Sequence, residues 1–499
     1  MLPDSIRITT QSEDQTAQLG ADIALILRAG DFIALSGDLG AGKSSLSRSI
    51  IRYLAQNSVL EVPSPSYTLC NTYETSPKIA HFDLYRLTDS QEIDELGWED
   101  ALQEGSILME WAELGFESLP DNAVQIAIKI SGENERQFAF EGNPDLLKRI
   151  KRSLEIRSFL NENGWENAKR KNLTGDASTR SYETIGTSGD ALLLMNAPAM
   201  TDGPPIKHGK PYSKIVHLAE DVKAFVAIDQ LLCEMGFRAP EIPAMNLSSG
   251  LLLIENLGAD LIIDADQQPI PDRYRGSIEF LNALHACTLP DQVQLVTGEN
   301  HIIPAYDKEA ILTEVELLLD WYAPDQSNEP ISQQAKQDFE VIWQDLFKIV
   351  EDQPKTLVLR DFHSPNIIWR EGAKGLDRIG LIDFQDAVVG PTAYDVASLA
   401  QDARVDVSER LESELINYYI ELGNLDYAGF DEEAFRTGYA IMAAQRATKV
   451  LGIFVRLDLR DGKPNYRKNI PRIEEYLRRS LQHPVLSDYQ KWLKSVIEL

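Results

Sequence analysis

The first 145 residues alternate short apolar runs with polar turns and helix-like segments. Residues 32–35 form a buried-strand run, and apolar residues recur at helical spacing over residues 45–55. Further strands, the last two as an antiparallel pair, are predicted at residues 79–84, 107–109, 124–130 and 137–140. This order of elements predicts a domain in which strands and helices alternate.

The pattern changes after residue 144. A charged helical stretch at 146–154 is followed by Asn-rich turn residues at 161–164. We predict a domain boundary near residue 147, giving domains 1–147 and 148–499. Composition leaves open whether the helical stretch is the last helix of the first domain or the first helix of the second.

The second part begins with strands and ends with helices. Strand-like runs occupy 181–196, a helix is predicted over 216–235, and a buried strand over 251–257. The remainder is mainly helical, with short strand runs at 357–359 and 379–382. A small sheet-containing lobe of about 155–255, followed by a helical lobe of about 260–499, matches the two-lobed plan of kinases.

Composition supports several domains and limits the possible partners. A chain of 499 residues is too long for one ordinary core. The net charge of -30 repels a phosphate backbone, so any role with RNA is expected to run through a partner protein. With no secretion leader and no apolar run of membrane-spanning length, we expect a cytoplasmic protein. Cys70, Cys233 and Cys287 are expected to be reduced and buried.

Residues 37–44, Gly-Asp-Leu-Gly-Ala-Gly-Lys-Ser, have the form of a P-loop between a strand and a helix. Glycines let backbone N–H groups wrap a phosphate, Lys43 reaches the outer phosphates, and Ser44 can hold Mg²⁺. A second metal ligand should stand at the end of a neighbouring strand, where Glu110 and Asp83 are both candidates. The predicted ATP contacts in the loop are Gly37, Asp38, Leu39, Gly40, Ala41, Gly42, Lys43 and Ser44.

A second phosphate-handling signature lies near the C-terminus. Asp361 and Asn366 have the spacing of a kinase catalytic loop, and Asp383 follows a short strand run. These residues supply a catalytic carboxylate beside the acceptor hydroxyl, an amide ligand and an acidic ligand for Mg²⁺. His363 is expected to order the loop by hydrogen bonding. Glu255, after a buried strand, is expected in the interlobe linker that meets adenine through its backbone.

Elements of protein kinases are missing from this second part. No Gly-x-Gly-x-x-Gly precedes its strands, Ala-Pro-Glu is absent, and Asp383-Phe-Gln replaces Asp-Phe-Gly. Protein substrates are therefore disfavoured. The predicted fold class is α/β multidomain: an N-terminal P-loop NTPase α/β domain plus a C-terminal two-lobed kinase-like (α+β) phosphotransferase domain.

Residues 5–140 resemble TsaE, the small ATPase of bacterial tRNA threonylcarbamoyladenosine synthesis. The resemblance rests on the P-loop, Pro-Ser-Pro-Ser-Tyr-Thr at 63–68, His-Phe-Asp-Leu-Tyr-Arg-Leu at 81–87 and Met-Glu-Trp at 109–111. It implies binding of ATP and Mg²⁺, and action with the TsaB and TsaD proteins on adenosine 37 of tRNA. It further implies that Glu110 is a metal ligand and that Asp83 positions the attacking water. Trp111, unless it is a plain core residue, and Arg136 would contact the nucleotide.

Residues 155–480 resemble AmgK, the anomeric kinase of N-acetylmuramate and N-acetylglucosamine, within the aminoglycoside phosphotransferase and choline kinase-like group. The resemblance rests on segments 173–180, 194–198, 383–391, 394–395, 444–446, 449–454 and 461–466. It implies an ATP-dependent kinase acting on an amino sugar in cell-wall recycling. Met195 stands where many kinases place a phosphate-binding Lys, so another cation, such as Arg180, would replace it.

The charge of the acceptor gives a further prediction. An aminoglycoside is polycationic, whereas N-acetylmuramate carries a carboxylate and calls for a cation. Arg446, Lys449 and Arg456 share a helical spacing, so their stripe faces either the pocket or solvent. Arg446 is the predicted contact for an anionic substrate. An aminoglycoside, choline or another alcohol remains an alternative acceptor, and the N-terminal domain is alternatively an ATP-gated binding module.

Overall fold

The structure is a computed structural model that describes residues 6–87, 93, 96–114, 119–173, 180–186, 191–200, 202–327 and 329–497. The chain divides into two compact units, Met1–Leu194 and Met195–Leu499, hereafter unit 1 and unit 2.

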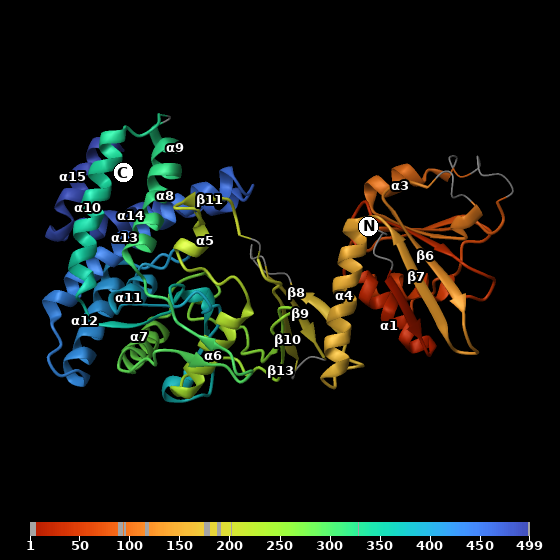
Figure 1. The fold of residues 1–499 in the computed structure, drawn as a ribbon, viewed down its shortest axis with the longest axis horizontal. Coiled ribbons are helices and arrows are strands. Elements are labelled where there is room, and N and C mark those ends of the chain that lie inside the picture. The colour runs from red at the N-terminus through yellow and green to blue at the C-terminus, as the bar shows by residue number, and fades with distance from the viewer. Residues whose placement is uncertain are drawn as a thin grey trace. The chain divides into compact units, whose positions relative to one another are not determined.

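A seven-stranded sheet with the order β1-β7-β6-β2-β5-β4-β3 forms the centre of unit 1 (Figure 1). Strand β2 lies between β5 and β6 and is parallel to both, and β4 is parallel to β5. Strand β7 pairs antiparallel with both β1 and β6, and β3 pairs antiparallel with β4. The bounds are β1 (Ile6–Thr10), β2 (Phe32–Ser36), β3 (Cys70–Tyr73), β4 (Ile79–Asp83), β5 (Ser106–Glu110), β6 (Ala123–Ile130) and β7 (Arg136–Gly142). All the strands expected in this region are therefore present.

Helices cover both faces of this sheet. Ile33 and Leu35 of β2 share a core with α1, α2 and α4, whereas Phe32 and Ala34 share another core with Trp98 of α3. Burial on both faces explains why the parallel strands are apolar throughout instead of alternating. The helices are α1 (Glu13–Ala24), α2 (Lys43–Leu54), α3 (Trp98–Glu104) and α4 (Pro144–Glu162).

Helix α4 resolves the ambiguity about the charged helical stretch. Leu146, Leu147 and Ile150 belong to the same core as α1 and α2, so the start of α4 packs as the last helix of that core. Asn143 caps it by accepting a hydrogen bond from the Leu146 N–H, and Pro144 occupies its first turn. The helix continues without a break through residue 147.

A second sheet has the strand order β13-β14-β10-β9-β8. Its strands are β8 (Arg170–Leu173), β9 (Ser181–Ile185), β10 (Leu192–Asn196), β13 (Ala244–Asn246) and β14 (Leu251–Ile254). The helix expected over 216–235 is shorter, because α6 (Val222–Glu234) begins only after Asp221. The extended Asp221 caps α6 by accepting a hydrogen bond from the Lys223 N–H, which fixes the start of the helix there.

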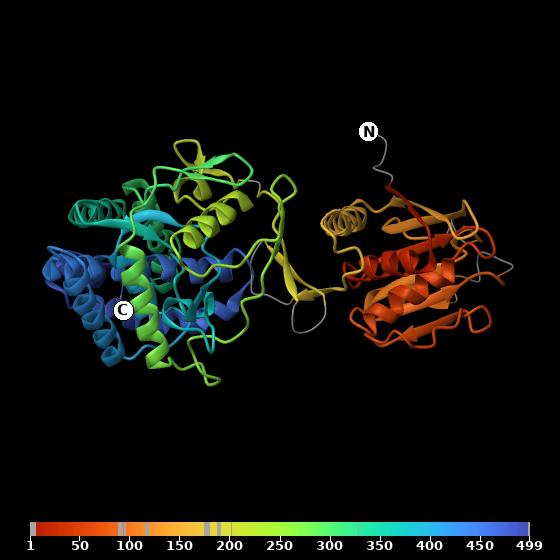
Figure 2. The ribbon, with the colours of Figure 1, turned by 90° about the horizontal axis from the view of Figure 1, so that it is seen from below.

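The rest of unit 2 is mainly helical. The blue helices near the C-terminus gather together in both views (Figure 1 and Figure 2). Two antiparallel pairs, β17–β20 and β18–β19, carry the catalytic segments. The longer helices are α7 (Pro271–His285), α8 (Lys308–Leu317), α10 (Gln333–Glu351), α11 (Ala393–Ala400), α12 (Glu409–Asp426), α13 (Glu432–Leu459), α14 (Ile470–Ser480) and α15 (Ser487–Val496), and the paired strands are β17 (Lys355–Val358), β18 (Ile367–Trp369), β19 (Ile379–Leu381) and β20 (Val388–Pro391).

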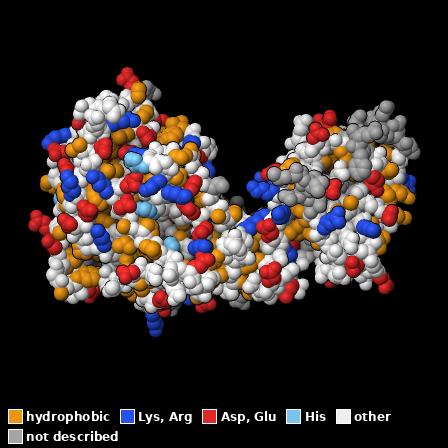
Figure 3. All heavy atoms as spheres, viewed as in Figure 1, with side chains coloured by type: hydrophobic (Ala, Val, Ile, Leu, Met, Phe, Trp, Pro, Cys, Tyr) orange, Lys and Arg blue, Asp and Glu red, His pale blue; other side chains and the backbone are white. Residues whose placement is uncertain are grey.

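The surface and the cysteines qualify the expectations from composition. On the face of unit 2 seen in Figure 3, acidic and basic side chains are interspersed. Among the described residues, no helix is both long and apolar enough to cross a membrane.

The three cysteines are free, but none is buried: Cys233 is exposed, and Cys70 and Cys287 are half-buried. The expectation of buried thiols was therefore wrong.

Candidate active sites

The predicted P-loop joins β2 to α2 and depends on its glycines. Gly37, Gly40 and Gly42 have φ angles of +137°, +77° and +111°, which side-chain-bearing residues rarely adopt. A Cβ atom on Gly37 would also lie 2.3 Å from the carbonyl oxygen of Ile128. Lys43 is 4% exposed, and its Nζ donates hydrogen bonds to the carbonyl oxygens of Gly37 at 2.5 Å and Asp38 at 3.1 Å. The loop and its lysine therefore form one compact cradle.

The two candidate acids stand opposite each other at the carboxyl ends of parallel strands. Asp83 of β4 is paired in register with Glu110 of β5. The Ser44 hydroxyl donates a hydrogen bond to Glu110 Oε2 at 2.6 Å, so the predicted metal ligands are already in contact. Asp83 accepts hydrogen bonds from the Ser64 hydroxyl and from the Tyr85 N–H. A hydroxyl and carboxylates are oxygen ligands of the kind Mg²⁺ prefers, so these residues fit that ion.

Trp111 and Arg136 both contact the P-loop. The centroid of the Trp111 ring lies 3.4 Å from Lys43 Nζ, so this half-buried side chain contacts the lysine of the P-loop. Arg136 Nε donates a hydrogen bond to the carbonyl oxygen of Ala41 at 3.1 Å. Burial lowers the pKa of Lys43 below its usual value, while Glu113 is the strongest of the carboxylates that oppose this shift.

Three further residues of this site were not singled out as functional from the sequence. His81 Nε2 lies 2.8 Å from Glu110 Oε1. Glu113 accepts a weak hydrogen bond from the Gly37 N–H at 3.4 Å, and Ser64 contacts Asp83. The sequence did contain an indication for His81. Side chains alternate along a strand, so His81 and Asp83 are expected on the same side of β4.

The three predicted catalytic residues of unit 2 meet at one place. Asp361, Asn366 and Asp383 line a single small cavity between the segments that follow β17 and β19. Asn366 Nδ2 donates to the carbonyl oxygen of Asp361 at 3.0 Å, and the Ile382 N–H donates to the carbonyl oxygen of Asn366 at 3.1 Å. The amide and carboxylate oxygens of Asn366 and Asp383 fit Mg²⁺.

The catalytic loop is held from behind by Asp395 of α11. Its carboxylate accepts hydrogen bonds from the N–H groups of Leu359 at 2.6 Å and Arg360 at 3.0 Å. Arg360 adopts a φ angle of +66°, so these bonds hold an unfavourable turn directly before Asp361. Burial raises the pKa of Asp395 to about 7, although the two N–H donors oppose the shift.

Asp361 remains ionised because of its cationic neighbours. Desolvation of this 41% exposed side chain would raise its pKa, but the charges of His363, Arg446 and Lys449 outweigh that effect and lower the pKa below the usual value. The hydrogen-bonding role expected for the His363 side chain was wrong within the described residues. Its Nδ1 is buried without a partner and its Nε2 lies 3.8 Å from Asp361 Oδ1, whereas its main chain does bond within the loop.

A buried polar cluster beneath the loop was not predicted. Glu314 of α8 accepts hydrogen bonds from Arg360, from Tyr306, from Gln445 at 2.9 Å and from Lys449 at 3.2 Å. The charges of Lys449 and Arg360 help to hold the pKa of Glu314 below its usual value despite burial, which alone would raise it. The Lys449 side chain is thus paired with Glu314, so this member of the predicted cationic stripe has a structural role.

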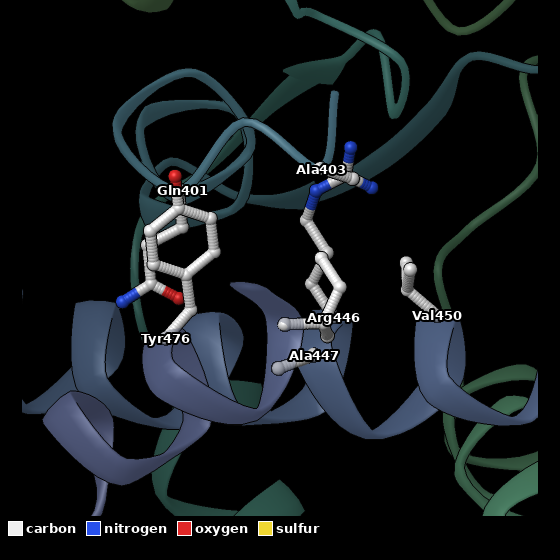
Figure 4. Close-up of a pocket in the computed structure, with 7 residues that line it drawn as sticks. Gln401, Ala403, Arg446, Ala447, Val450 and Tyr476 are labelled. Carbon is white, nitrogen blue, oxygen red and sulfur yellow. The ribbon is translucent and has the colours of Figure 1, made fainter. Parts of the chain in front are cut away.

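Arg446 of α13 differs from Lys449. It is 5% exposed, yet its Nε has no hydrogen-bond partner among the described residues. In Figure 4 its guanidinium points away from α13, towards the segment that carries Ala403. Beside it lies a cavity of about 10 Å³, also lined by Gln401 and Tyr476. A solvated helix face is therefore ruled out for Arg446, because its side chain is buried next to the catalytic loop.

The remaining predicted positions lie in or near the small sheet. Glu255 directly follows β14, and its N–H donates to the carbonyl oxygen of Glu241 at 2.8 Å. Its carboxylate accepts a hydrogen bond from Arg238, and its contact with adenine stays a prediction. Met195 is buried on β10, and Arg180 immediately precedes β9. Residues 174–179 of the segment resembling AmgK lie outside the described residues.

Comparison with known proteins agrees with this division. The family model for threonylcarbamoyl adenosine biosynthesis protein TsaE matches residues 10–138, and that for the phosphotransferase enzyme family matches residues 169–434. An N-acetylmuramate/N-acetylglucosamine kinase of Caulobacter vibrioides is 33% identical over 67% of this chain and 94% of its own length. A TsaE protein of Rickettsia felis is 38% identical over 25% of this chain and 73% of its own length. The chain belongs to both families.

The fold class and the resemblances predicted from the sequence are thereby confirmed. The protein is a fusion of a TsaE domain and a kinase domain similar to N-acetylmuramate/N-acetylglucosamine kinases, of which another, from Pseudomonas putida, is 30% identical over 87% of its length. The kinase domain is an ATP-dependent phosphotransferase, and the TsaE domain is of the ATPase type.

Proposed function

We propose that this cytoplasmic protein is bifunctional. Its TsaE domain hydrolyses ATP in support of threonylcarbamoyladenosine formation at position 37 of tRNA, and its kinase domain phosphorylates the anomeric hydroxyl of N-acetylmuramate or N-acetylglucosamine. The observation that carries the proposal is that each phosphate site has its own set of acids. Asp83 and Glu110 stand beside Lys43, and Asp361 and Asp383 share a separate cavity.

In the kinase domain Asp361 is the catalytic base. The anomeric oxygen bonds to the γ-phosphorus of ATP while the bond from that phosphorus to the bridging oxygen breaks, and Asp361 accepts the hydroxyl proton. The products are ADP and a sugar 1-phosphate. Asn366 and Asp383 would hold Mg²⁺, which neutralises charge on the phosphates. The backbone of Glu255 would contact adenine.

Arg446 is proposed to bind the carboxylate of N-acetylmuramate. Its buried Nε has no hydrogen-bond partner among the described residues, which is costly, and a ligand carboxylate would satisfy it. N-acetylglucosamine lacks that carboxylate, so the two sugars form a matched pair of substrates. Arg446→Gln should lower kcat/KM for N-acetylmuramate about 10- to 100-fold and leave that for N-acetylglucosamine nearly unchanged. Equal loss for both sugars would remove this assignment.

In the TsaE domain, residues 37–44 would hold the phosphates of ATP, with Trp111 and Arg136 contributing to nucleotide binding. Ser44 and Glu110 would hold Mg²⁺, and Asp83 would position the attacking water. Leu39 of the P-loop is an apolar side chain that is 74% exposed, which leaves it accessible to a partner protein. We propose that the partners are TsaB-like and TsaD-like proteins, through which the acidic chain acts on tRNA indirectly.

The kinase assignment is tested by supplying the full chain with ATP and each candidate acceptor. N-acetylmuramate or N-acetylglucosamine should yield a sugar 1-phosphate, and Asp361→Asn should abolish its formation, whereas full activity in that variant would refute the assigned base. Transfer to an aminoglycoside or to choline, but to neither sugar, would favour the alternative acceptor class.

The TsaE assignment is tested in the Asp361→Asn background, where the kinase site cannot turn over ATP. Lys43→Ala should abolish the remaining hydrolysis, and unchanged hydrolysis would contradict the assigned site. Capture of TsaB and TsaD with and without ATP gives the second measurement. ATP-dependent capture without measurable hydrolysis would make the domain mainly an ATP-gated binding module.

A further inference from the structure

A tight turn in unit 2 contacts both segments that carry the proposed catalytic residues. It comprises residues 216–219, shortly before α6, and is hereafter the clamp. The carbonyl oxygen of Val216 accepts a hydrogen bond from Arg360 Nη1 at 2.7 Å. The Ala219 N–H donates a hydrogen bond to Asp386 Oδ1 at 2.6 Å. Both contacts use main-chain atoms of the clamp, so its backbone conformation sets their spacing.

Each contact lies close in sequence to a residue with a proposed role in phosphoryl transfer. Arg360 is 3% exposed and directly precedes Asp361, the proposed base. Asp386 lies three residues after Asp383, the proposed metal ligand, and Gln385 Nε2 donates a hydrogen bond to Asp383 Oδ1 at 3.1 Å. The clamp therefore connects the segment of the base with the segment of the metal ligand.

The backbone is strained in the clamp and in both segments that it contacts. His217 has a φ angle of +57°, and Arg360 and Asp383 have φ angles of +66° and +60°. Residues other than glycine rarely adopt this region, and they remain in it only where the surrounding structure imposes it. The hydrogen bonds of the clamp are among the contacts that hold the two catalytic segments in place.

His217 anchors the clamp to α8. Its Nε2 lies 3.1 Å from Asp307 Oδ2, and Asp307 caps α8 by accepting a hydrogen bond from the Ala310 N–H at 2.8 Å. The same helix carries Glu314, which accepts a hydrogen bond from Arg360. Helix α8 therefore holds both the clamp and the arginine that the clamp contacts.

Phosphoryl transfer requires the base and the metal ligand at a fixed spacing, and a misplacement of about 1 Å can cost about 100-fold in rate. We infer that the clamp holds Asp361 and Asp383 at the spacing needed for transfer, and that His217 and Asp386 are positioning residues. This inference rests on the proposed kinase function. Because the clamp acts on the chemical step, loosening it should lower kcat and leave KM for the acceptor unchanged.

The first test measures sugar phosphorylation by the full chain with substitutions at His217. His217→Gly removes the side chain but accepts a positive φ, whereas His217→Val also opposes that φ because Val is β-branched. We expect kcat to fall about 3-fold in His217→Gly and about 10-fold or more in His217→Val, with KM for the sugar unchanged. Lys210→Gln is the matched control, because it breaks an exposed ion pair between the preceding residues and α8, and it should match the parent.

The second test concerns the contact with Asp386. Asp386→Ala leaves the Ala219 N–H without this acceptor and should lower kcat about 10-fold, whereas Asp386→Asn keeps an oxygen acceptor and should stay within about two-fold of the parent. If His217→Val does not fold, this pair of variants decides. An unchanged kcat in Asp386→Ala and in every folded His217 variant would overturn the inference. Equal losses in Asp386→Ala and Asp386→Asn, or a raised KM for the sugar at unchanged kcat, would also overturn it.

The choice of acceptor separates this inference from the proposed sugar. The clamp acts on Asp361 and Asp383, so the same pattern of kcat values is expected with whichever acceptor the parent phosphorylates. Transfer to an aminoglycoside or to choline but to neither sugar, with kcat lowered in the variants, would refute only the proposed acceptor. Sugar phosphorylation by the parent, with kcat unchanged in the variants, would overturn only the role of the clamp.

Discussion

Asp229 of α6 should make the stability of the kinase domain depend on pH. This carboxyl is 6% exposed, and its Oδ1 has no hydrogen-bond partner among the described residues. Burial raises its pKa from 3.8 to about 7, although Arg238 opposes the shift. Because the folded-state pKa is raised, the carboxyl costs no stability below pH 4. The cost grows as the pH rises to 7 and is constant above that value.

The magnitude follows from the shift. A difference of about 3 pKa units corresponds to about 4 kcal/mol at pH 8, and about 2 kcal/mol of this is already present at pH 5.5. Asp229→Asn has nearly the same shape and no charge at either pH. The variant should therefore gain stability relative to the wild type, and the gain should increase by about 2 kcal/mol between pH 5.5 and pH 8.

Urea unfolding of the full chain, followed by a probe in the kinase domain, measures this difference. The series starts at pH 5.5 because the isoelectric point is about 4.6. Subtracting wild type from variant at each pH cancels the titration of other groups. Glu234→Gln, an exposed change on the same helix, should show no pH-dependent gain. A gain for Asp229→Asn that is constant with pH, or a loss at every pH, would refute the assigned burial cost.

Three other predictions concern the two phosphate sites. Gly37→Ala should abolish nucleotide binding to the P-loop, because the new Cβ would clash with Ile128. ADP titration in an Asp361→Asn background measures this binding. Gly40→Ala is the control, and it should bind ADP more tightly than Gly37→Ala because the space around Gly40 is open. His81→Leu should slow ATP hydrolysis by the TsaE domain about 10-fold, measured at saturating ATP, because Glu110 loses its contact with the imidazole of His81. Glu314→Gln should destabilise the kinase domain by about 3 kcal/mol in urea unfolding, because Arg360 and Lys449 lose their shared carboxylate.

Local signals in the sequence were sufficient for most of the two sites. The P-loop is a contiguous stretch whose glycines and lysine are each required by its backbone, so its place between β2 and α2 could be predicted. The spacing of Asp361, Asn366 and Asp383 likewise reflects one loop and one hairpin, which bring all three to one cavity. The start of α6 was misplaced because apolar residues continue upstream of its cap, Asp221.

Long-range pairings could not be predicted in the same way. Glu314 meets Arg360 and Lys449 from positions 46 and 135 residues away, and Asp22 meets Arg170 across 148 residues. Such pairs depend on how helices pack, and nothing in the local pattern distinguishes these acids from solvated ones. In the sequence Lys449 and Arg446 also have the same apparent role. The position of Glu314 distinguishes them, because Glu314 pairs with Lys449, whereas the Nε of Arg446 has no hydrogen-bond partner among the described residues.

The surroundings of the acids support different fates for the phosphoryl group at the two sites. Asp83 is 3% exposed and already accepts hydrogen bonds from the Ser64 hydroxyl and from the Tyr85 N–H. The Asp361 side chain is 41% exposed, and the Nε of the nearby Arg446 has no hydrogen-bond partner among the described residues. A bulky acceptor can therefore reach Asp361, and an anionic one would gain a partner there. The surroundings of the two carboxylates thus support the proposed hydrolysis at the first site and the proposed transfer to a sugar at the second.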